Sequence, residues 1–259
     1  MQNWTLITGA SEGLGKEFAR IAAKAGRNLI LTARSEDKLH ALAQELSGTA
    51  GEVVVIPADL NDLAEAERLW TEASADRRID VLVNNAGLGS HGAFGAPETW
   101  PTELTSINVN ILAYTFLMNR AVAHMKGHKA GRILNVASVA GFTPGPNMAV
   151  YHATKAYALH LSEAVAEELR GTNVTVTALC PGATETGFFD AADMDGVRLL
   201  KMRKPMTAAE VAQAGWQAMI GGKTVIVTGI MNKVFAILPR ITPRFMTTFV
   251  AGKIMGKGR

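Results

Sequence analysis

Cysteine is nearly absent from this chain, since Cys180 is the only one among 259 residues. A single thiol excludes an internal disulfide and a cysteine-rich metal site. The six histidines are scattered without carboxylate companions, so the ligand spacing of the usual zinc motifs is missing as well. The sequence therefore predicts that the protein holds no metal.

Long apolar runs are missing too. No uninterrupted apolar stretch reaches the ~18 residues of a membrane-spanning helix. The amino terminus also lacks the basic segment and the apolar core of a signal peptide. We therefore expect a cytoplasmic protein.

Acidic residues are absent from the last part of the chain. After Glu210 there are seven lysines and arginines and no acidic residue, which leaves 19 basic against 23 acidic residues upstream. Apolar residues are interleaved with these cations, and Pro239 and Pro243 divide the segment into short pieces. We predict a basic amphipathic extension over residues 230–259 that packs on the domain or on a neighbouring subunit, with peripheral contact to an anionic membrane as the alternative. Nucleic-acid binding is not expected, because the cations lack base-stacking partners.

Short apolar runs are present, and they alternate with longer helical stretches. The runs lie at residues 4–7, 28–32, 53–56, 81–83, 132–136, 174–179 and 224–228. This rhythm predicts an α/β fold, a Rossmann-type doubly wound parallel sheet with helices on both faces. The length and a hydrophobic content of 48% suit one domain, which we assign to residues 1–229. Sheets of this type bind ligands at the carboxyl ends of their strands.

A glycine-rich turn joins the first run to a helix. Residues 8–15 read TGASEGLG, and residues 16–25 have helical character. Glycines let the backbone approach a diphosphate, and the free N–H groups at the start of the helix attract its charge. Ala10 stands where a P-loop needs its first glycine, and Glu17 follows Lys16, so ATP hydrolysis is not indicated. The turn indicates a dinucleotide site.

Tyr151 and Lys155 are four residues apart, which places both side chains on one face of a helix. A nearby cation favours the phenolate, and it lowers the pKa of a phenol from its ordinary value of about 10. A tyrosine tuned in this way transfers protons. Because the same spacing also occurs on solvated helices, the interpretation depends on the surrounding motifs.

Five motifs in register resemble the short-chain dehydrogenase/reductase family over residues 5–227. The turn matches the family's Thr-Gly-x3-Gly-x-Gly, and residues 84–87, NNAG, follow an apolar run as they do in the family. Ser138 lies thirteen residues before Tyr151, and Pro181-Gly182 is completed by Thr186 in a Pro-Gly-x3-Thr pattern. Within the family, the motifs look most like those of bacterial reductases of unassigned substrate.

The resemblance implies hydride transfer between a nicotinamide and a carbonyl or secondary alcohol. Tyr151 would be the acid or base, and Lys155 would lower its pKa and hold the nicotinamide ribose. Ser138 would donate a hydrogen bond to the substrate oxygen. Asn110 would complete the tetrad by orienting a water, with Asn108 as the alternative. Such relatives act on small molecules as homodimers or homotetramers.

The end of the second strand decides which dinucleotide binds. An acidic residue there would favour NAD, but this chain has Ala33 followed by Arg34 and Ser35, which suit the 2′-phosphate of NADP. We therefore expect NADP(H), with NAD(H) less favoured. Glu12 departs from this pattern, because many NADP-preferring relatives carry a basic residue at that position. The cofactor-binding residues given by the motifs and the resemblance are Gly9, Ser11, Glu12, Gly13, Leu14, Gly15, Arg34, Ser35, Asp59, Leu60, Asn85, Ala86, Gly87, Tyr151, Lys155, Pro181, Gly182, Thr184 and Thr186.

Three points stay open in the sequence. Asp59 either contacts the adenine, as its counterpart does in the family, or only caps a helix. Residues 183–206 correspond to the family's lid, and their many apolar side chains serve either an apolar substrate or the packing of the lid. The alternatives to a reductase of ketones, aldehydes or 3-oxoacyl groups are a non-catalytic dinucleotide-sensing regulator and a membrane-associated lipid reductase.

Overall fold

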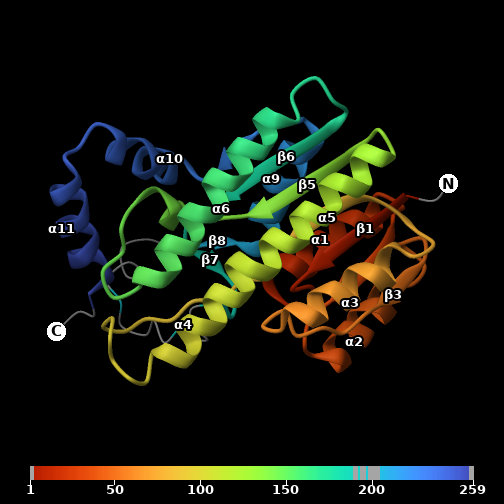
Figure 1. Cartoon of the computed structure of the whole chain (residues 1–259), viewed down its shortest axis with the longest axis horizontal. Coiled ribbons are helices and arrows are strands. Elements are labelled where there is room, and N and C mark those ends of the chain that lie inside the picture. Colours follow the sequence, from red (N-terminus) through yellow and green to blue (C-terminus); the bar gives the residue numbers. More distant parts are fainter. Residues whose placement is uncertain (1–2, 189–191, 193–196, 198–204, 257–259) are drawn as a thin grey trace.

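The computed structural model describes residues 3–188, 192, 197 and 205–256. Seven parallel strands form one sheet in the order β3-β2-β1-β4-β5-β6-β9. The chain starts in the middle of this sheet, builds outward to β3, and then returns to β4 on the other side of β1 (Figure 1). The predicted doubly wound sheet is thereby confirmed. Its strands are β1 (Asn3–Thr8), β2 (Asn28–Thr32), β3 (Val53–Val55), β4 (Arg78–Asn84), β5 (Gly131–Val136), β6 (Val174–Cys180) and β9 (Val225–Val227).

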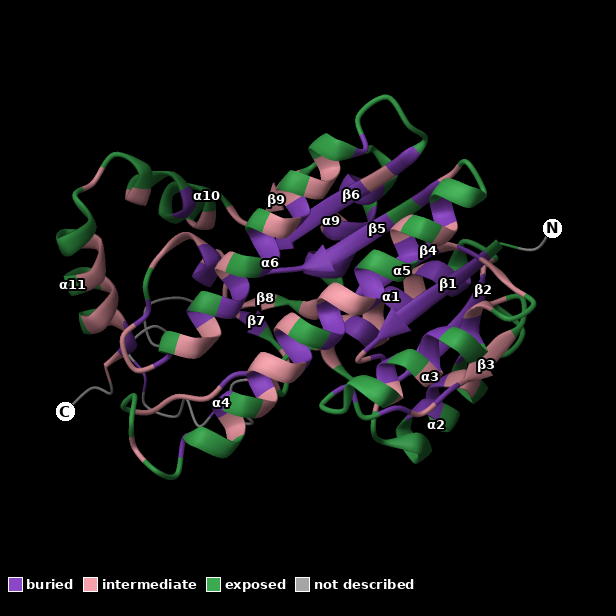
Figure 2. Ribbon diagram, in the orientation of Figure 1, coloured by how far each residue is buried: buried purple, intermediate pink, exposed green. Residues whose placement is uncertain are grey.

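Helices cover both faces of the sheet, and each face has its own hydrophobic core. Alternate residues of one strand enter opposite cores, as Leu6 and Ile7 of β1 do. The central strands are therefore largely buried on both sides, as is typical of a parallel sheet covered by helices (Figure 2). One core is closed by α1 (Gly13–Lys24), α2 (Glu36–Leu46) and α9 (Ala208–Ile220), and the other by α3 (Leu63–Ser74), α5 (Tyr114–Gly127) and α6 (Ala149–Glu168).

A π-helical segment interrupts the longest helical stretch. Helix α4 (Trp100–Ile107) passes into the π-helix η1 (Asn108–Ala113), which passes directly into α5. π-Helical turns are rare, and they are frequently found at functional sites. This one carries Asn110, the candidate chosen from the sequence.

Two further segments lie beside the carboxyl ends of the strands. The short strands β7 (Thr184–Glu185) and β8 (Met206–Thr207) pair with each other and join the two ends of the predicted lid. Most of that lid, including Phe189, Met194 and Leu199, falls outside the described residues.

The last described segment is a pair of short helices, which we call the carboxyl-terminal arm. It consists of α10 (Ile230–Ile237), the 3-10 turn η3 (Leu238–Arg240) and α11 (Arg244–Met255). Pro239 lies in the turn and Pro243 precedes α11 as its N-cap, so both prolines separate the helices. The arm extends from the body of the molecule at the end toward which the strands point (Figure 1). None of the described helices is both long and apolar enough to cross a membrane.

Candidate active site

The glycine turn after β1 is locked against the end of β4. Gly9 has a φ of +63°, which favours glycine, and a Cβ on Gly15 would lie 2.1 Å from the Gly9 carbonyl oxygen. The Thr8 hydroxyl accepts hydrogen bonds from the backbone N–H groups of Asn85 and Ala86, both at 2.9 Å. In return, the Asn85 side-chain amide donates to the Thr8 carbonyl at 2.8 Å. Thr8 and Asn85 therefore hold the turn in shape, a role that the sequence alone does not reveal.

The turn opens onto a cleft of about 1230 Å³ at the carboxyl ends of the strands. Residues that follow each strand of the large sheet line it, from Gly9 after β1 to Gly229 after β9. Helix α1 begins at the cleft, and its N-cap, Glu12, makes no capping hydrogen bond. The first N–H groups of α1 are thus left for an anionic ligand.

The cleft gathers nearly all the predicted catalytic and cofactor-binding residues. Gly15 and Asn110 are the exceptions, because Gly15 packs on the turn and Asn110 lies behind the wall. The predicted residues that line the cleft are Gly9, Ser11, Glu12, Gly13, Leu14, Arg34, Ser35, Asp59, Leu60, Asn85, Ala86, Gly87, Ser138, Tyr151, Lys155, Pro181, Gly182, Thr184 and Thr186.

Tyr151 and Lys155 both lie on α6, one helical turn apart, with the Lys155 Nζ 5.8 Å from the centre of the Tyr151 ring. Lys155 is buried and donates a hydrogen bond of 2.9 Å to the Val136 carbonyl. Burial lowers the pKa of Lys155 to about 8. Burial raises the pKa of Tyr151 to about 12, although a hydrogen bond with the Ser138 side chain acts in the opposite direction.

This pKa differs from the sequence expectation that Lys155 lowers the pKa of Tyr151. The physical reason is that both groups have lost their hydration, so each favours its neutral form. The Lys155 ammonium is also directed at the Val136 carbonyl. The protein alone therefore holds Tyr151 as a neutral phenol, the form that donates a proton.

Ser138 stands at the end of β5, where the 3-10 helix η2 (Val139–Phe142) begins. Its hydroxyl accepts a hydrogen bond of 3.1 Å from the Ala140 N–H. The turn packs directly on α6, since a Cβ on Gly141 would lie 2.7 Å from the Lys155 carbonyl oxygen. This contact fixes Ser138 relative to the helix that carries Tyr151.

Asn110 links three segments of the chain. Its side-chain amide donates to the Leu88 carbonyl at 2.8 Å and to the Thr154 hydroxyl at 3.0 Å, and its oxygen accepts from the Leu88 N–H at 3.1 Å. Asn108, the alternative candidate, instead donates to Asn61 at an exposed position. Asn110 thus connects the π-helix to the loop after β4 and to the residue before Lys155. Thr154 was missed in the sequence, because nothing in a local motif marks this pairing.

The adenosine end of the cleft carries an exposed cation and an ion pair. Arg34 and Ser35 line it at the end of β2, and Arg34 makes no ion pair within the described part of the chain. The Lys38 ammonium lies 3.1 Å from the Glu12 carboxylate across the rim. Lys38 therefore balances the negative charge of Glu12, and the sequence did not single it out.

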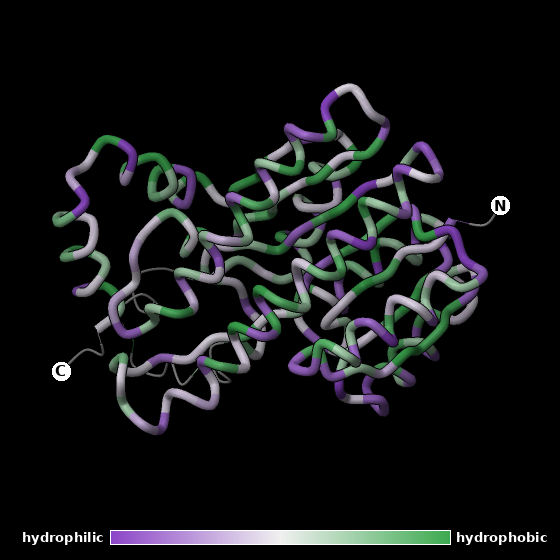
Figure 3. The backbone as a smooth tube through the Cα atoms, in the orientation of Figure 1, coloured by the Kyte–Doolittle hydropathy of each residue, from purple (hydrophilic) through white to green (hydrophobic). Residues whose placement is uncertain are grey.

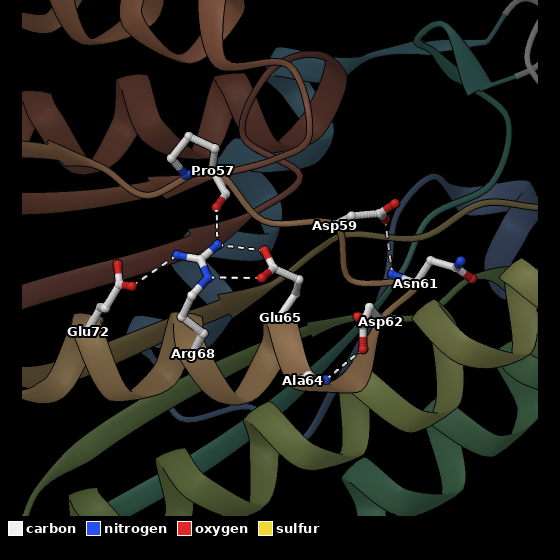
Figure 4. A network of polar contacts seen from close by, with 8 residues as sticks. All are labelled: Pro57, Asp59, Asn61, Asp62, Ala64, Glu65, Arg68 and Glu72. Carbon is white, nitrogen blue, oxygen red and sulfur yellow. Dashed lines mark hydrogen bonds and ion pairs between the residues drawn. The ribbon is translucent and has the colours of Figure 1, made fainter.

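The loop after β3 is anchored by an arginine of α3 (Figure 4). The Arg68 guanidinium donates to the Pro57 carbonyl at 2.6 Å and contacts two carboxylates of its own helix, Glu65 and Glu72. Asp59 accepts a hydrogen bond of 3.1 Å from the Asn61 N–H, whereas the N-cap of α3 is Asp62. Asp59 is consequently not the helix cap, and its place in the cleft wall fits a ligand contact.

The opposite end of the cleft is apolar. Met148 and Met255 belong to a small hydrophobic cluster on which Tyr151 and Phe188 pack, with the two ring centres 5.1 Å apart. The arm contributes to the same wall, and its Asn232 lies directly over the Pro-Gly motif: a Cβ on Gly182 would lie 2.3 Å from the Asn232 amide nitrogen. Asn232 is a third residue that sequence reasoning missed.

Comparison with known proteins agrees with this arrangement. The family model of short chain dehydrogenases matches residues 3–195. Nodulation protein G of Rhizobium sp. (strain N33) is 33% identical over 238 residues, which cover 86% of this chain and 94% of that protein.

Two solved structures share the whole architecture. A short-chain dehydrogenase from Sphingobium yanoikuyae in complex with NADPH superposes with a TM-score of 0.80 at 29% identity, covering 94% of this chain and 97% of that one. A 7beta-hydroxysteroid dehydrogenase gives a TM-score of 0.84 at 27% identity and covers 96% of both chains. The chain therefore belongs to the short chain dehydrogenase family of oxidoreductases.

Proposed function

We propose that the protein reduces the carbonyl group of an apolar substrate with NADPH. One observation carries this proposal. Tyr151, Ser138 and Lys155 line one wall of the cleft, and the glycine turn and Arg34 line its other end. The raised pKa of Tyr151 agrees with its role as a neutral proton donor in this reduction.

The cleft fits a dinucleotide phosphate. The close approach of Gly15 to the Gly9 carbonyl and the uncapped start of α1 leave room and N–H donors for a diphosphate. Arg34 suits a 2′-phosphate, and the ion pair with Lys38 offsets the charge by which Glu12 would repel that group. The structural relative bound to NADPH supports the same choice.

Each residue then has a distinct role. Bound NADPH would supply the hydride. The Tyr151 hydroxyl donates the proton that the substrate oxygen takes up, and Ser138 donates a hydrogen bond to the same oxygen as its negative charge grows. Lys155 holds the nicotinamide ribose and, when charged, favours loss of the Tyr151 proton. Asn110 acts as a positioning residue, since both N–H groups of its amide are used by Leu88 and Thr154 and its oxygen accepts from the Leu88 N–H.

An apolar substrate is supported by the wall beside Tyr151. Met148, Phe188 and Met255 surround the reacting end with hydrocarbon and aromatic groups. The similarity to a 7beta-hydroxysteroid dehydrogenase agrees with a ligand of this kind. Sterols and fatty-acyl chains both suit such a wall, so the assay includes both.

Self-association is supported by an apolar surface away from the cleft. Leu104, Leu112 and Tyr157 are large apolar side chains exposed on the neighbouring helical segments α4, η1 and α6. We propose that this helical face forms the contact of a homodimer or homotetramer.

The function is tested by replacing the proton donor. Tyr151→Phe removes only the hydroxyl, so we expect the rate of carbonyl reduction to fall by about 10²–10⁴-fold while the Kd for NADPH changes little. NADPH oxidation would be followed with ketones, aldehydes, 3-oxoacyl thioesters and ketosteroids. Near-normal turnover by the variant would refute the assignment of Tyr151. Tight NADPH binding by the native chain without turnover on any substrate would favour the dinucleotide-sensing regulator instead.

A further inference from the structure

The carboxyl-terminal arm carries most of the exposed large apolar side chains of the described chain. Eleven of the eighteen large apolar side chains that are exposed among the described residues lie between Ile230 and Val250. Figure 3 shows hydrophobic positions recurring along both helices of the arm, with hydrophilic ones between them. A concentration of this size marks a surface that meets another apolar phase.

The arm has two apolar faces. Residues Met246, Val250 and Ile254 of α11 recur every four positions and line the cleft. A second set points elsewhere, because Phe245 and Phe249 are 75% and 63% exposed and do not line it. The other outward members of this set are Val234, Ile237 and Ile241. The arm therefore serves the cleft with one face and leaves the other without a partner in the described chain.

The charges on the arm all have the same sign. Lys233, Arg240, Arg244 and Lys253 are exposed, and none of the four pairs with an acidic group of the described chain. Lys253 instead stacks on Phe249, with its ammonium 4.5 Å from the ring centre. No acidic residue follows Glu210 in the sequence. A surface that combines apolar side chains with unpaired cations complements anionic lipid headgroups above acyl chains.

A second copy of the chain fits this face less well. A twofold contact brings the same patch of both subunits together. The cations of one arm would then face those of the other, without a carboxylate on either arm to separate them. A membrane surface satisfies the apolar side chains and the cations at the same time.

We propose that the carboxyl-terminal arm docks on an anionic membrane surface as a peripheral element. The cleft opens at the same place, because Met231, Phe235, Leu238, Met246 and Val250 are exposed and also line it. Docking would bring this apolar mouth to the lipid boundary. If the proposed reduction is correct, an apolar substrate enters from the bilayer through the mouth; the docking itself does not depend on the reaction.

Flotation of the full-length protein with vesicles tests the proposal without an activity assay. We expect flotation with phosphatidylcholine vesicles that contain about one third phosphatidylglycerol, and much less with phosphatidylcholine alone or at high salt. Two variants separate the apolar from the electrostatic contribution. F245S/F249S removes the exposed aromatic side chains, and K233Q/R240Q/R244Q/K253Q removes the cations. Each should lower the fraction bound to anionic vesicles by about tenfold or more.

The controls carry matched changes elsewhere on the surface. F94S removes an aromatic side chain that is 74% exposed outside the arm. The set K24Q/K126Q/K129Q/K223Q removes four exposed cations outside the arm. Both controls should float like the native chain, and NADPH affinity would verify that every variant is folded. Absence of flotation by the native chain, or equal loss in arm variants and controls, would overturn the proposal. A lower solution mass of F245S/F249S without vesicles would show instead that the arm contacts a second copy.

Discussion

Burial sets the protonation of the two groups on α6 that face the cleft. Tyr151 and Lys155 are close enough to interact. Yet the pKa of Tyr151 is raised and that of Lys155 is lowered, so burial favours the neutral form of each side chain. Desolvation penalises an isolated charge strongly, whereas a neighbouring cation stabilises a phenolate only while that neighbour remains charged. The spacing of the pair identifies the chemistry, but its surroundings decide the resting state.

The buried ammonium of Lys155 should make stability depend on pH. Its pKa falls from 10.5 in the unfolded chain to about 8 in the folded one. Below pH 8 both states are protonated, and the folded state bears the full penalty of the buried charge. Above it the unfolded chain binds more protons, so the free energy of unfolding rises with pH.

Lys155→Met removes this dependence. Urea denaturation would give the free energy of unfolding of the native chain and of the variant. We expect the native value minus the variant value to rise by about 2 kcal/mol between pH 7 and about pH 9.5. Lys129→Met, at an exposed position, is the matched control and should show no such slope. A difference that stays flat or falls with pH would mean that Lys155 is not held as a buried cation.

Arg34 should decide between the two dinucleotides. Arg34→Leu removes the cation at the adenosine end, so the KM for NADPH should rise by about tenfold or more while that for NADH changes little, since only NADPH has the 2′-phosphate. Steady-state kinetics with both cofactors measure this. Lys24→Met, another exposed cation, should leave both values unchanged. A native preference for NADH would show that the end of β2 is misread.

At the scale of elements, burial explains which strands the sequence reveals. β2 (Asn28–Thr32) is buried along its whole length, and its predicted and observed limits coincide. β4 (Arg78–Asn84) begins earlier than the predicted residues 81–83, because Asp80 lies within the strand and pairs with Arg27. A polar residue that is paired with a distant residue can lie within a strand, and a prediction from local hydrophobicity alone then ends the strand too early.

The residues of the candidate site also fall into two groups, those that the sequence predicts and those that it does not. Motifs within one turn or helix are visible in the sequence, and their residues line the cleft. Thr154, Lys38 and Asn232 were missed, because each acts through a partner 26 or more residues away. The π-helical turn at Asn110 has no local signal either, since its asparagine bonds to Leu88 and Thr154 from other segments.

The contact between η2 and α6 should be intolerant of a single methyl group. A Cβ on Gly141 would meet the Lys155 carbonyl oxygen at 2.7 Å and its carbon at 2.9 Å, and backbone atoms move only if the helix moves. Gly141→Ala should therefore lower the free energy of unfolding by about 2 kcal/mol and reduce turnover, because Ser138 shifts relative to Tyr151. Denaturation and kinetics are the measurements. Gly127→Ala, with nothing within 4 Å of the new Cβ, should be neutral or stabilising. Equal effects of the two substitutions would contradict a tight fit at η2.

At the scale of the whole molecule, two apolar surfaces differ in charge and therefore in the partner they suit. The arm combines its apolar side chains with four cations. Beside Leu112, by contrast, the Thr115 and Tyr157 hydroxyls bond to each other, and Arg120 is the cation that stacks on Phe116. A face with fewer cations can meet its own copy around a twofold axis with less repulsion. Self-association and membrane docking are then separate properties of two different surfaces.

The oligomer should depend on the helical face and not on the arm. We expect sedimentation velocity to show the native chain as a dimer or tetramer of the 27.5-kDa subunit. Leu112→Glu buries a carboxylate in the proposed contact, so it should shift the protein toward the monomer. Leu63→Glu places the same charge at a leucine of similar exposure on α3, 41% against 47%, and should leave the mass unchanged. A native chain that sediments as a monomer, or a Leu112→Glu variant that keeps the native mass, would contradict this assignment. Because neither substitution touches the arm, flotation with anionic vesicles should persist in both, which keeps the two surfaces experimentally distinct.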